Sequence, residues 1–534
     1  MSVLDTRWLA PAARAVALGV ALQGTAWAQA PGAAPRNDAL GTIAQIGQYA
    51  DPARPAGPAV QLQPDQTIAP QPSAWSADTF RKNREQGAMA DSVTRGELDG
   101  VVDLGRAWRL TVSNDPTYQA AFSALQASQT FEGQGRAALL PQVRAGYNRY
   151  RITGTRRTPG RFGETVESPL DYDSTGAVVQ LQQPVLNYGR YAAYLRGLAQ
   201  AGEGRASFDV RAQETGVRLA TAYFNVLLAH HDLELQRNLV DSLRKQLHAQ
   251  QTLYKGNEGT LIDAQETQAR LAMAEAGLIL ADDELRVTTR NLQAMLGAQP
   301  LRLTTVKEDF PTPALIPGAL DDWLARARQN NAQVRAAREA VRVADANVDS
   351  AASQYFPTVD FVATYNDADS ENLSTLSQRS NTVTLGLRMN IPIFTGGYTT
   401  AATSQARSER KRTESMLAAI TEQVEAEVTR QFTAVQGGVP RIQAYASAVK
   451  AGTEALVAAQ QGYKFGAYSN LDVLKVQDKL FQSKYDLMKA QLEYVLARLQ
   501  LAMAVGDLQD SVFDQVAAVF LGPVVPLLQP VQVP

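Results

Sequence analysis

The chain carries an internal repeat of about 200 residues, and this duplication constrains the fold more than any other feature of the sequence. The first copy opens with LGRAWRLTVSNDP at Leu104 and the second with LDDWLARARQNNA at Leu320. In both copies a proline lies 37 positions further on, at Pro141 and at Pro357. Later segments match in the same order and at a nearly constant offset. Chance similarity between two helical segments would not repeat in this ordered way, so we interpret the chain as two copies of one structural unit.

The repeat sets the domain organisation that we expect. The first copy covers 103–297 and the second covers 318–507, and a linker at 298–317 joins them near the equator of the molecule. Residues 508–534 form a C-terminal tail. Residues 29–102 are rich in proline and alanine without helical or strand periodicity, so we expect a poorly ordered N-terminal extension.

Each copy shows the same order of predicted elements. A helix leads to the first proline, and two strands separated by a polar loop lead to a second proline, at Pro184 and at Pro392. A very long helix and a helix of about 37 residues follow. The predicted helices, taken pairwise from the two copies, span 104–140 and 320–355, 187–254 and 395–463, and 260–296 and 470–505. A helix of about 68 residues is about 100 Å long, which is far beyond a globular helix and implies coiled-coil packing.

Heptad spacing of apolar residues supports this interpretation. In the second copy, large residues recur at every seventh position, at Val473, Leu480, Leu487, Tyr494 and Leu501. Smaller residues, mostly alanine, occupy the position three residues later. Large residues at one position and small residues at the other permit close antiparallel packing of two helices. The heptads alone also fit a helical bundle in another class of protein.

The strand before Pro392 has the alternation of a membrane-spanning β-strand. In TVTLGLRMNIP every second residue is apolar, and Thr, Gly, Arg and Asn stand between them. An apolar face backed by polar residues is typical of a barrel strand with lipid outside and water inside. The residues that we predict to face lipid are Val383, Leu385, Leu387 and Met389. A half-buried strand of a soluble sheet alternates in the same way, so the alternation alone leaves both interpretations open.

The number of strands implies that several chains share one barrel. Each chain has four predicted strands, whereas the smallest outer-membrane barrels have about eight, and a membrane barrel must close to leave no edge in lipid. Three chains would supply twelve strands. The strand–strand links, at 153–172 and 366–381, are polar and are expected to be outward-facing loops. Proline, which lacks an amide donor, stands at each predicted helix–strand junction: Pro141, Pro184, Pro357 and Pro392.

The N-terminus has the features of a secretory signal peptide, which we place at 1–28. Arg7 and Arg14 supply positive charge, Ala15–Leu22 is a short apolar run, and a small-x-small site ends at Ala28. After this segment, no stretch approaches the roughly 20 apolar residues of a membrane-spanning helix. We therefore expect an exported chain that is periplasmic, extracellular or a β-barrel.

The composition argues against an enzyme and against a nucleic-acid-binding protein. The chain has no cysteine, which excludes thiolate chemistry and a cysteine-linked lipid anchor, and we expect no cofactor. Its three histidines are His230, His231 and His248, and the adjacent pair lacks the i,i+4 spacing of a metal site on a helix. The 51 Lys and Arg residues nearly balance the 53 Asp and Glu residues, so no nucleic-acid surface is expected.

Taken together, these features resemble those of the TolC family of outer-membrane efflux and secretion proteins. The resemblance covers about 103–507 and rests on the duplication, the proline-bounded hairpins, the PIFTGGY turn from Pro392 and the GYKFG segment from Gly462. It implies a mainly α-helical fold with a small β-barrel contribution, in which long antiparallel coiled-coil helices and four transmembrane strands per chain are internally duplicated. A homotrimer would complete a 12-stranded barrel and an α-helical tunnel.

The resemblance also implies a location and a set of partners. The location is the outer membrane of a Gram-negative bacterium, with the helical tunnel in the periplasm. The partners are outer-membrane lipid, a periplasmic adaptor protein and an inner-membrane pump of the ABC type or of another type. The family closes its tunnel at the periplasmic tips of the coiled coils, with an aspartate ring and a hydrogen-bonding network. The gate residues that the resemblance implies here are Asp472, Tyr463, Asp263, Tyr254, Tyr468 and Lys475.

Two of these gate positions depart from the family pattern. Tyr468 stands where the family has a gating arginine, and Lys475 stands where it has the second aspartate of the constriction. Asp472 keeps the place of the first aspartate. Three nearby lysines would reduce the field of three Asp472 carboxylates, so we expect a weakly cation-selective tip that is held shut by different contacts from the family's usual ones.

The expected function is that of an export duct, which conducts proteins in type I secretion or small molecules from the inner-membrane pump. The absence of cysteine excludes the lipidated branch of the family, many of whose members serve drug pumps. This favours secretion, with a drug-efflux duct as the alternative. Two other classes remain as rivals: a periplasmic adaptor, which would need its hairpin between β-rich halves, and an extracellular structural coiled-coil protein.

Overall fold

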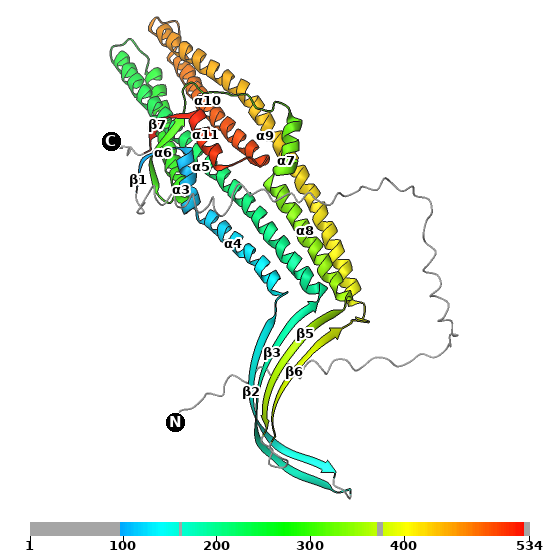
Figure 1. Ribbon diagram of the computed structural model, residues 1–534. Helices are drawn as coiled ribbons and strands as arrows, with labels where there is room; N and C mark the ends of the chain where they lie inside the picture. The colour runs from blue at the N-terminus through cyan, green and yellow to red at the C-terminus, as the bar shows by residue number, and fades with distance from the viewer. Residues whose placement is uncertain (1–96, 160–162, 371–377, 528–534) are drawn as a thin grey trace, which may run out of the picture. The chain divides into compact units, whose positions relative to one another are not determined.

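The computed structural model describes residues 97–159, 163–370 and 378–527. The predicted signal peptide at 1–28 and most of the predicted extension at 29–102 lie outside these residues. The described part contains the duplicated region, and the two copies have the same order of elements (Figure 1). The fold is mainly α-helical with a smaller β-sheet contribution, as the sequence predicts.

In the first copy the structure has the elements that the repeat predicts, with one helix more. The elements are α3 (Leu104–Asn114), α4 (Pro116–Ala137), β2 (Gln142–Pro159), β3 (Thr165–Leu186), α5 (Tyr188–Lys255) and α6 (Leu261–Leu296). The second copy follows the same order, and a short 3-10 turn at Ser353–Tyr355 ends its second helix. Its elements are α7 (Leu320–Asn330), α8 (Ala332–Ala352), β5 (Thr358–Ser370), β6 (Gln378–Asn390), α9 (Tyr398–Lys464) and α10 (Asn470–Ala504).

The single helices predicted at 104–140 and 320–355 are each broken into two. The break falls at Asp115 in the first copy and at Asn331 in the second, and each of these residues caps the helix that follows. The Asp115 carboxylate accepts a hydrogen bond from the backbone N–H of Tyr118 at 3.0 Å. The Asn331 side-chain oxygen accepts one from the N–H of Val334 at 3.0 Å. The side-chain oxygens of Asp and Asn accept hydrogen bonds from the free backbone N–H groups at the start of a helix, so these residues favour a new helix start. Apolar periodicity alone does not reveal such a break.

The two long helices have nearly equal lengths, 68 residues for α5 and 67 for α9. Each turns back at its far end and packs along a shorter helix, α5 against α6 and α9 against α10. The helix α10 also packs against α5, so the order across this half of the molecule is α6, α5, α10, α9 (Figure 1). At the other end α4, α5, α8 and α9 lie side by side in that order. None of the helices in the described residues is both long and apolar enough to cross a membrane.

A three-stranded sheet that was not predicted lies at the middle of the helical part. It is formed by β1 (Glu97–Val102), β4 (Gln299–Val306) and β7 (Leu521–Pro526), in the order β1-β4-β7. These strands come from the predicted extension, linker and C-terminal tail. Each strand is short and finds its partners only through contacts distant in sequence, which is why local periodicity did not predict them.

The C-terminal tail also contains a helix, α11 (Asp510–Phe520), that packs on α3. The ring of Phe513 stacks on that of Trp108 with centroids 4.8 Å apart, and Trp108 Nε1 donates to an Asp510 carboxylate oxygen at 2.8 Å. Trp108 and Phe513 are both almost completely buried. The tail is therefore part of the main hydrophobic core, and it ties the end of the chain to the start of the first copy.

The second sheet continues from the ends of α4, α5, α8 and α9 and is entirely antiparallel, in the order β2-β3-β5-β6 (Figure 1). Its strands are longer than predicted, because much of the predicted loops at 153–172 and 366–381 is strand. Polar residues alone do not indicate a loop here, because the residues of a hairpin that lies outside lipid can be polar and still pair along its length. The links between strands shrink to 160–164 and 371–377.

Candidate channel wall and gate

The four predicted lipid-facing residues of β6 lie on one face of the antiparallel sheet. Their partners across the ladder are apolar as well: Val383 pairs with Tyr365, Leu385 with Ala363, Leu387 with Phe361 and Met389 with Val359. Val179 and Leu181 of β3 and Val143 and Tyr147 of β2 continue this face, which we call the apolar face. The predicted four are 60–71% exposed. A soluble monomer rarely exposes so large an apolar surface, so this face requires lipid or another apolar cover.

The opposite face of the same sheet, which we call the polar face, carries residues suited to water. Arg144 stands opposite Gln180, and Arg388 stands opposite Asp360. A hydrogen bond from Gln182 Nε2 to Asp360 at 3.0 Å links β3 to β5 on this face. One apolar and one polar face is the pattern of a barrel wall with lipid outside and water inside.

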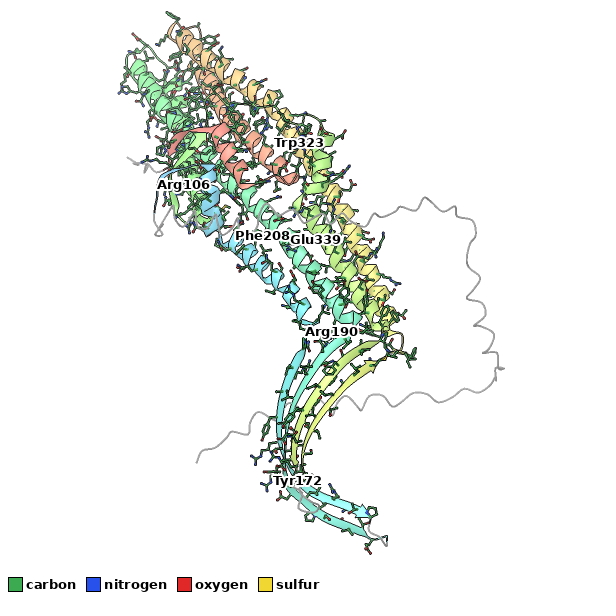
Figure 2. The ribbon with its side chains drawn as sticks, in the orientation of Figure 1. Arg106, Tyr172, Arg190, Phe208, Trp323 and Glu339 are labelled. Carbon is green, nitrogen blue, oxygen red and sulfur yellow. The ribbon has the colours of Figure 1, made fainter. Side chains whose placement is uncertain are left out.

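The four prolines lie where helices give way to strands. Pro141 directly precedes β2, and Pro357 directly precedes β5. Pro392 lies two residues after the end of β6. Pro184 differs from the prediction because β3 runs two residues past it, to Leu186. The ladder with β5 shifts register between Pro184 and Leu186, as expected for a residue without an amide donor. Arg190, labelled in Figure 2, fixes this junction by donating a hydrogen bond to the carbonyl of Ala138 at 3.0 Å.

Aromatic side chains gather at the same junction, and sequence reasoning missed them. The ring of Tyr188 lies 5.2 Å from that of Phe356 and 6.5 Å from that of Tyr191. All three are exposed, and Phe394 in the PIFTGG turn is 87% exposed. Barrel proteins carry such aromatic residues where the apolar band meets water. The sequence does contain a signal for this cluster, because an aromatic residue lies within six positions of each junction proline.

At the far end of the coiled coils, Tyr463 of α9 contacts α5. Its hydroxyl lies 2.8 Å from Nε2 and 3.0 Å from Oε1 of Gln250. Gln250 is 2% exposed, and Asn470, the first residue of α10, is 1% exposed. The Asn470 amide oxygen accepts from Gln246 at 2.6 Å and from Gln250 at 3.2 Å, and its nitrogen donates to the Thr267 hydroxyl at 3.0 Å. We call these five residues the tip network.

The tip network joins the two copies of the repeat. Gln246 and Gln250 belong to α5 and Thr267 to α6, whereas Tyr463 and Asn470 belong to α9 and α10. Beside it, Leu474 of α10 is buried among residues of the first-copy coiled coil, Val240 and Leu271 among them. No member of the network carries a charge at neutral pH, so the contact differs from an arginine–aspartate latch. Sequence reasoning missed Asn470, Gln246 and Gln250 as contact residues, because their partners lie more than 200 positions away.

The two aspartates expected at the gate cap helices. Asp472 Oδ2 accepts from the backbone N–H of Ser469 at 3.0 Å and from its hydroxyl at 2.6 Å. These bonds, with a smaller contribution from the Lys475 ammonium, lower the pKa of Asp472. Asp263 holds the corresponding place at the start of α6, where its carboxylate accepts from the Thr260 hydroxyl at 2.7 Å. The structure does not bring Asp263 and Tyr463 into a hydrogen bond.

The two remaining tip tyrosines are largely exposed, Tyr254 to 44% and Tyr468 to 53%. The Tyr468 ring lies directly on Gly462 and leaves no room there for a Cβ atom. Tyr468 therefore contacts the end of α9 by packing, where the family pattern has an arginine.

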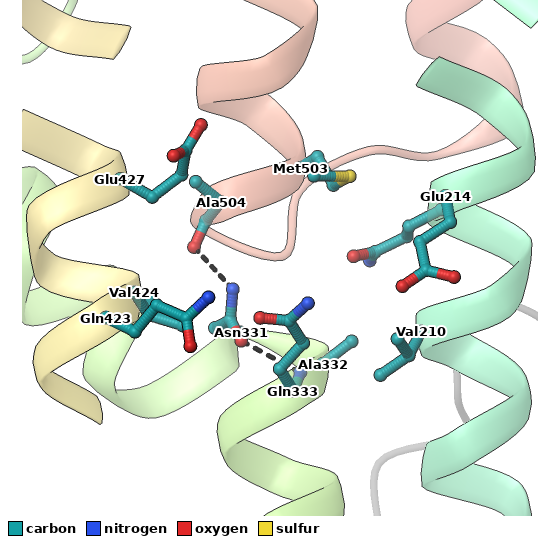
Figure 3. Close-up of a pocket in the computed structure, with 11 residues that line it drawn as sticks. Val210, Glu214, Asn331, Ala332, Gln333, Gln423, Val424, Glu427, Met503 and Ala504 are labelled. Carbon is teal, nitrogen blue, oxygen red and sulfur yellow. Dashed lines mark hydrogen bonds between the residues drawn. The ribbon is translucent and has the colours of Figure 1, made fainter. Parts of the chain in front are cut away.

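A small pocket lies between α5 and the second-copy helices, and Figure 3 shows its lining. Asn331 crosses one side of the pocket and donates to the carbonyl of Ala504 at 2.8 Å, joining α8 to the end of α10. The pocket has a volume of about 170 Å³, which is too small for export cargo. We assign it a structural role at the contact between the two copies.

The histidines do not assemble a metal or catalytic site. His230 Nε2 lies 3.1 Å from the carbonyl oxygen of Pro526, and burial lowers the pKa of His231. Within the described residues, no group of three or more His, Cys, Asp or Glu side chains is placed to hold a metal ion.

The sheet has one apolar and one polar face, and it continues from paired long helices whose far ends are joined by hydrogen bonds. These features define a class, an outer-membrane channel with a helical periplasmic part. The family model described as "Outer membrane efflux protein" matches residues 109–298 and 323–507. The alkaline protease secretion protein AprF of Pseudomonas aeruginosa is 31% identical over 438 residues, which are 81% of this chain and 88% of the relative. The chain belongs to this TolC family of outer-membrane efflux proteins and is an outer-membrane protein with its helices in the periplasm.

Two further comparisons agree with the assignment. The proteases secretion protein PrtF of Dickeya chrysanthemi is 29% identical over 425 residues, covering 78% of this chain and 90% of the relative. The crystal structure of the CmeC outer membrane channel of Campylobacter jejuni superposes with a TM-score of 0.66 at 14% identity, covering 76% of this chain and 86% of that chain. The second likeness concerns the fold alone. The family is one of transport channels.

Proposed function

We propose that this chain is the outer-membrane duct of a type I protein-secretion system. The observation that carries the proposal is the match to AprF and PrtF over most of each chain, since both are named for protease secretion. The absence of cysteine agrees with it, because a lipid-anchored duct needs that residue. The partners in this proposal are an inner-membrane ABC pump, which selects the cargo, and a periplasmic adaptor that links pump and duct.

A drug-efflux duct is the alternative. The likeness to CmeC favours neither function, because at 14% identity it concerns the fold alone, and one fold can serve several functions. Deleting the gene in the native host separates the two functions. Secretion predicts the loss of one or a few extracellular proteins with unchanged susceptibility to small toxic compounds. Raised susceptibility with an unchanged set of extracellular proteins would overturn the secretion proposal and support efflux.

We propose that the duct is a homotrimer, and two unpartnered helix faces support this. On α6, away from α5, exposed apolar residues alternate between large and small at heptad spacing. This α6 outer face consists of Ile262, Ala269, Met273, Ala276, Leu280 and Val287. Met273 is 75% exposed and Leu280 is 70% exposed. Water is a poor environment for such a row, so we expect a second helix to cover it.

The helix α9, at the other edge of the four-helix layer, offers the complement. One exposed row on it consists of small residues at steps of four and three: Ala444, Ala448, Ala451, Ala455 and Ala458. All five are exposed. Large knobs on α6 of one chain fit between small residues on α9 of the next, and repeating this contact around an axis closes a ring. Three copies give the twelve strands that the barrel requires.

Cross-linking tests this contact directly in the cysteine-free chain. Met273→Cys combined with Ala451→Cys should yield disulfide-linked dimers and trimers on oxidation. Met273→Cys combined with Ala446→Cys, also on α9, serves as the control for position. A cross-linking yield no higher in the first pair than in the control would contradict the proposed contact.

We propose that the tip network is the latch of the periplasmic gate, together with Asp472, Asp263, Tyr254, Tyr468 and Lys475 around it. The support is its place, at the end of the coiled coils and between the two copies. Opening the tip requires α9 and α10 to move away from α5 and α6. That movement breaks the hydrogen bonds of Asn470 and Tyr463 to the first copy while leaving each coiled coil intact.

A further inference from the structure

The hairpin of β2 and β3 extends well beyond the rest of its sheet. The strand β5 ends opposite Ser174, so residues 151–159 and 165–173 pair with each other alone among the described strands. We call this part the outer arm. Its nine residue pairs span about 30 Å at the usual rise of a strand. Figure 1 shows the hairpin bending away from the line of the sheet at this end.

The polarity of the two faces is reversed in the outer arm. The ladder from Gln142 to Pro159 is continuous, without a register shift, so alternate residues stay on one side throughout. Below the arm, the apolar face carries Val143 and Tyr147. Further out, the same side carries three ion pairs: Arg149 with Asp173 at 2.8 Å, Arg151 with Asp171 at 3.2 Å, and Arg157 with Glu167.

The other side of the arm changes in the opposite sense. Near the helices it is the polar face, with Arg144 and Asn148. Further out it is mainly apolar and aromatic, with Ile152 opposite Tyr172 and with Tyr150, Leu170 and Val166 around them, although Arg156 also stands on this side, opposite Ser168. Tyr150 is 57% exposed and Val166 is 46% exposed. Tyr172 is labelled near the bend of the hairpin in Figure 2.

This reversal indicates where the arm leaves the membrane and what its inner side contacts. Charged pairs on the outward side place it in water beyond the lipid. The inward side looks over the mouth of the barrel, where the exposed Tyr150 and Val166 and their half-buried apolar neighbours gain free energy by covering one another. In a ring of identical chains, the nearest surface of matching character is the same side of the next arm.

The dimensions permit this contact. Twelve strands with a spacing of about 4.8 Å and a tilt of about 40° enclose a barrel of roughly 12 Å radius. An arm of about 30 Å is long enough to reach the axis from the wall. We propose that the three outer arms fold toward the axis and pack their apolar inner sides together, narrowing the outer mouth of the duct. This inference rests on the proposed homotrimer.

Single cysteines in the cysteine-free chain test the inference. Ile152→Cys and Tyr172→Cys place a thiol on the inner side of the arm, and Thr153→Cys places one on the outer side at the same height. The trimer is purified, reconstituted in lipid vesicles and treated with a short bismaleimide. We expect inter-chain dimers with at least about five-fold higher yield from Ile152→Cys or Tyr172→Cys than from Thr153→Cys.

A second readout measures the mouth itself. Replacing the inner side by Tyr150→Ser together with Ile152→Thr should increase the access of a large uncharged polymer to the lumen from the outer chamber, measured as block of the channel current. Equal cross-linking from both sides of the arm, or no cross-linking with unchanged polymer access, would overturn the inference. If the unaltered chain forms no trimer, the proposed assembly fails as well; a normal trimer without contacts between inner sides overturns this inference alone.

Discussion

The hydroxyl of Tyr463 and the side-chain amide of Gln250 are paired through both amide atoms, at 2.8 and 3.0 Å. The tyrosine belongs to the second copy of the repeat and the glutamine to the first. Gln250 also donates to Asn470, so one buried amide ties both second-copy helices to α5. At this end of the coiled coils, neutral hydrogen bonds therefore join the two copies of the repeat.

Removing this amide should weaken the latch. Gln250→Ala removes both hydrogen bonds of the Tyr463 hydroxyl to α5 and leaves the Asn470 oxygen with Gln246 as its remaining donor. A buried polar group left unpaired costs about 1–3 kcal/mol. We expect a higher open probability and larger mean conductance in planar bilayers. Gln251→Ala, on the exposed neighbouring position of the same helix, is the matched control. Indistinguishable currents from the two variants would contradict the latch.

The charge at position 475 should set the ion selectivity of the tip. In a trimer, Lys475→Glu replaces three cations by three carboxylates close to Asp472. We therefore expect stronger cation selectivity, measured as a shift of the reversal potential in a salt gradient toward the equilibrium potential of the cation. Lys479→Glu, on the same helix one turn further on, controls for a general change in charge. An unchanged reversal potential in Lys475→Glu would show that these side chains do not line the constriction.

The pKa of Asp472 should make this selectivity resistant to acid. Hydrogen bonds from Ser469 lower the pKa, so the carboxylate stays charged below its ordinary range, and the capping stabilisation is lost only as the pH falls through the lowered value. Ser469→Ala removes the main cause of the shift. We expect the cation preference of this variant to disappear at a higher pH than in the unaltered chain. If the reversal potential changes at the same pH in Ser469→Ala and in the unaltered chain, this prediction is wrong.

The two faces of β6 should respond differently to the same substitution. Leu385→Arg puts a charge on the apolar face, at a cost of about 2–4 kcal/mol near the middle of the membrane. Thr384→Arg puts it on the adjacent polar face, where water solvates it. We expect Leu385→Arg to reduce the amount of assembled protein in outer-membrane fractions and Thr384→Arg to leave it near normal. The reverse order would mean that the assignment of the faces is wrong.

A buried carboxylate between the two copies should make the helical part pH-sensitive. Asp209 of α5 is 1% exposed and pairs with Arg335 of α8 at 3.1 Å. Burial raises its pKa to about 6, partly offset by Arg335. A raised carboxyl pKa means that the folded state favours the proton, so stability is highest at low pH and falls as the pH rises toward 6.

Asp209→Asn should therefore raise the melting temperature of the helical signal in circular dichroism above pH 6 and flatten its dependence between pH 4 and 6. The expected gain is on the order of 3 kcal/mol, at about 1.4 kcal/mol per pKa unit. Asp345→Asn, which loses a surface ion pair with Arg410, is the control and should change little. A pH profile unaffected by Asp209→Asn would contradict the role of this carboxylate.

The sequence predicted the long helices and the apolar face well because both follow from short repeats. Heptads place Val473, Leu480, Tyr494 and Leu501 at the contact between helices, and all four are buried. Alternation by two places Leu385 and its neighbours on one side of a strand. Local spacing alone determines which residues of a helix or strand share a face, so the face can be predicted before its partner is known.

The remaining features depend on contacts between distant segments. The strand β4 is recognised only beside β1 and β7, and Asn470 becomes a contact residue only because Gln246 and Thr267 lie next to it. The charged outer arm was taken as a loop because polarity was used as a sign of irregular structure. Its arginines and acids pair across two strands, which a one-dimensional pattern does not reveal.

We propose that this chain forms an outer-membrane duct that is closed at its periplasmic tip. Single-channel recording of the purified full chain in planar bilayers can test this, with the unaltered chain and Gln250→Ala compared under the same conditions. We expect small, stable currents from the unaltered chain and a several-fold larger conductance when the latch is broken. Failure of both proteins to conduct after confirmed insertion, or a large conductance already present in the unaltered chain, would contradict it.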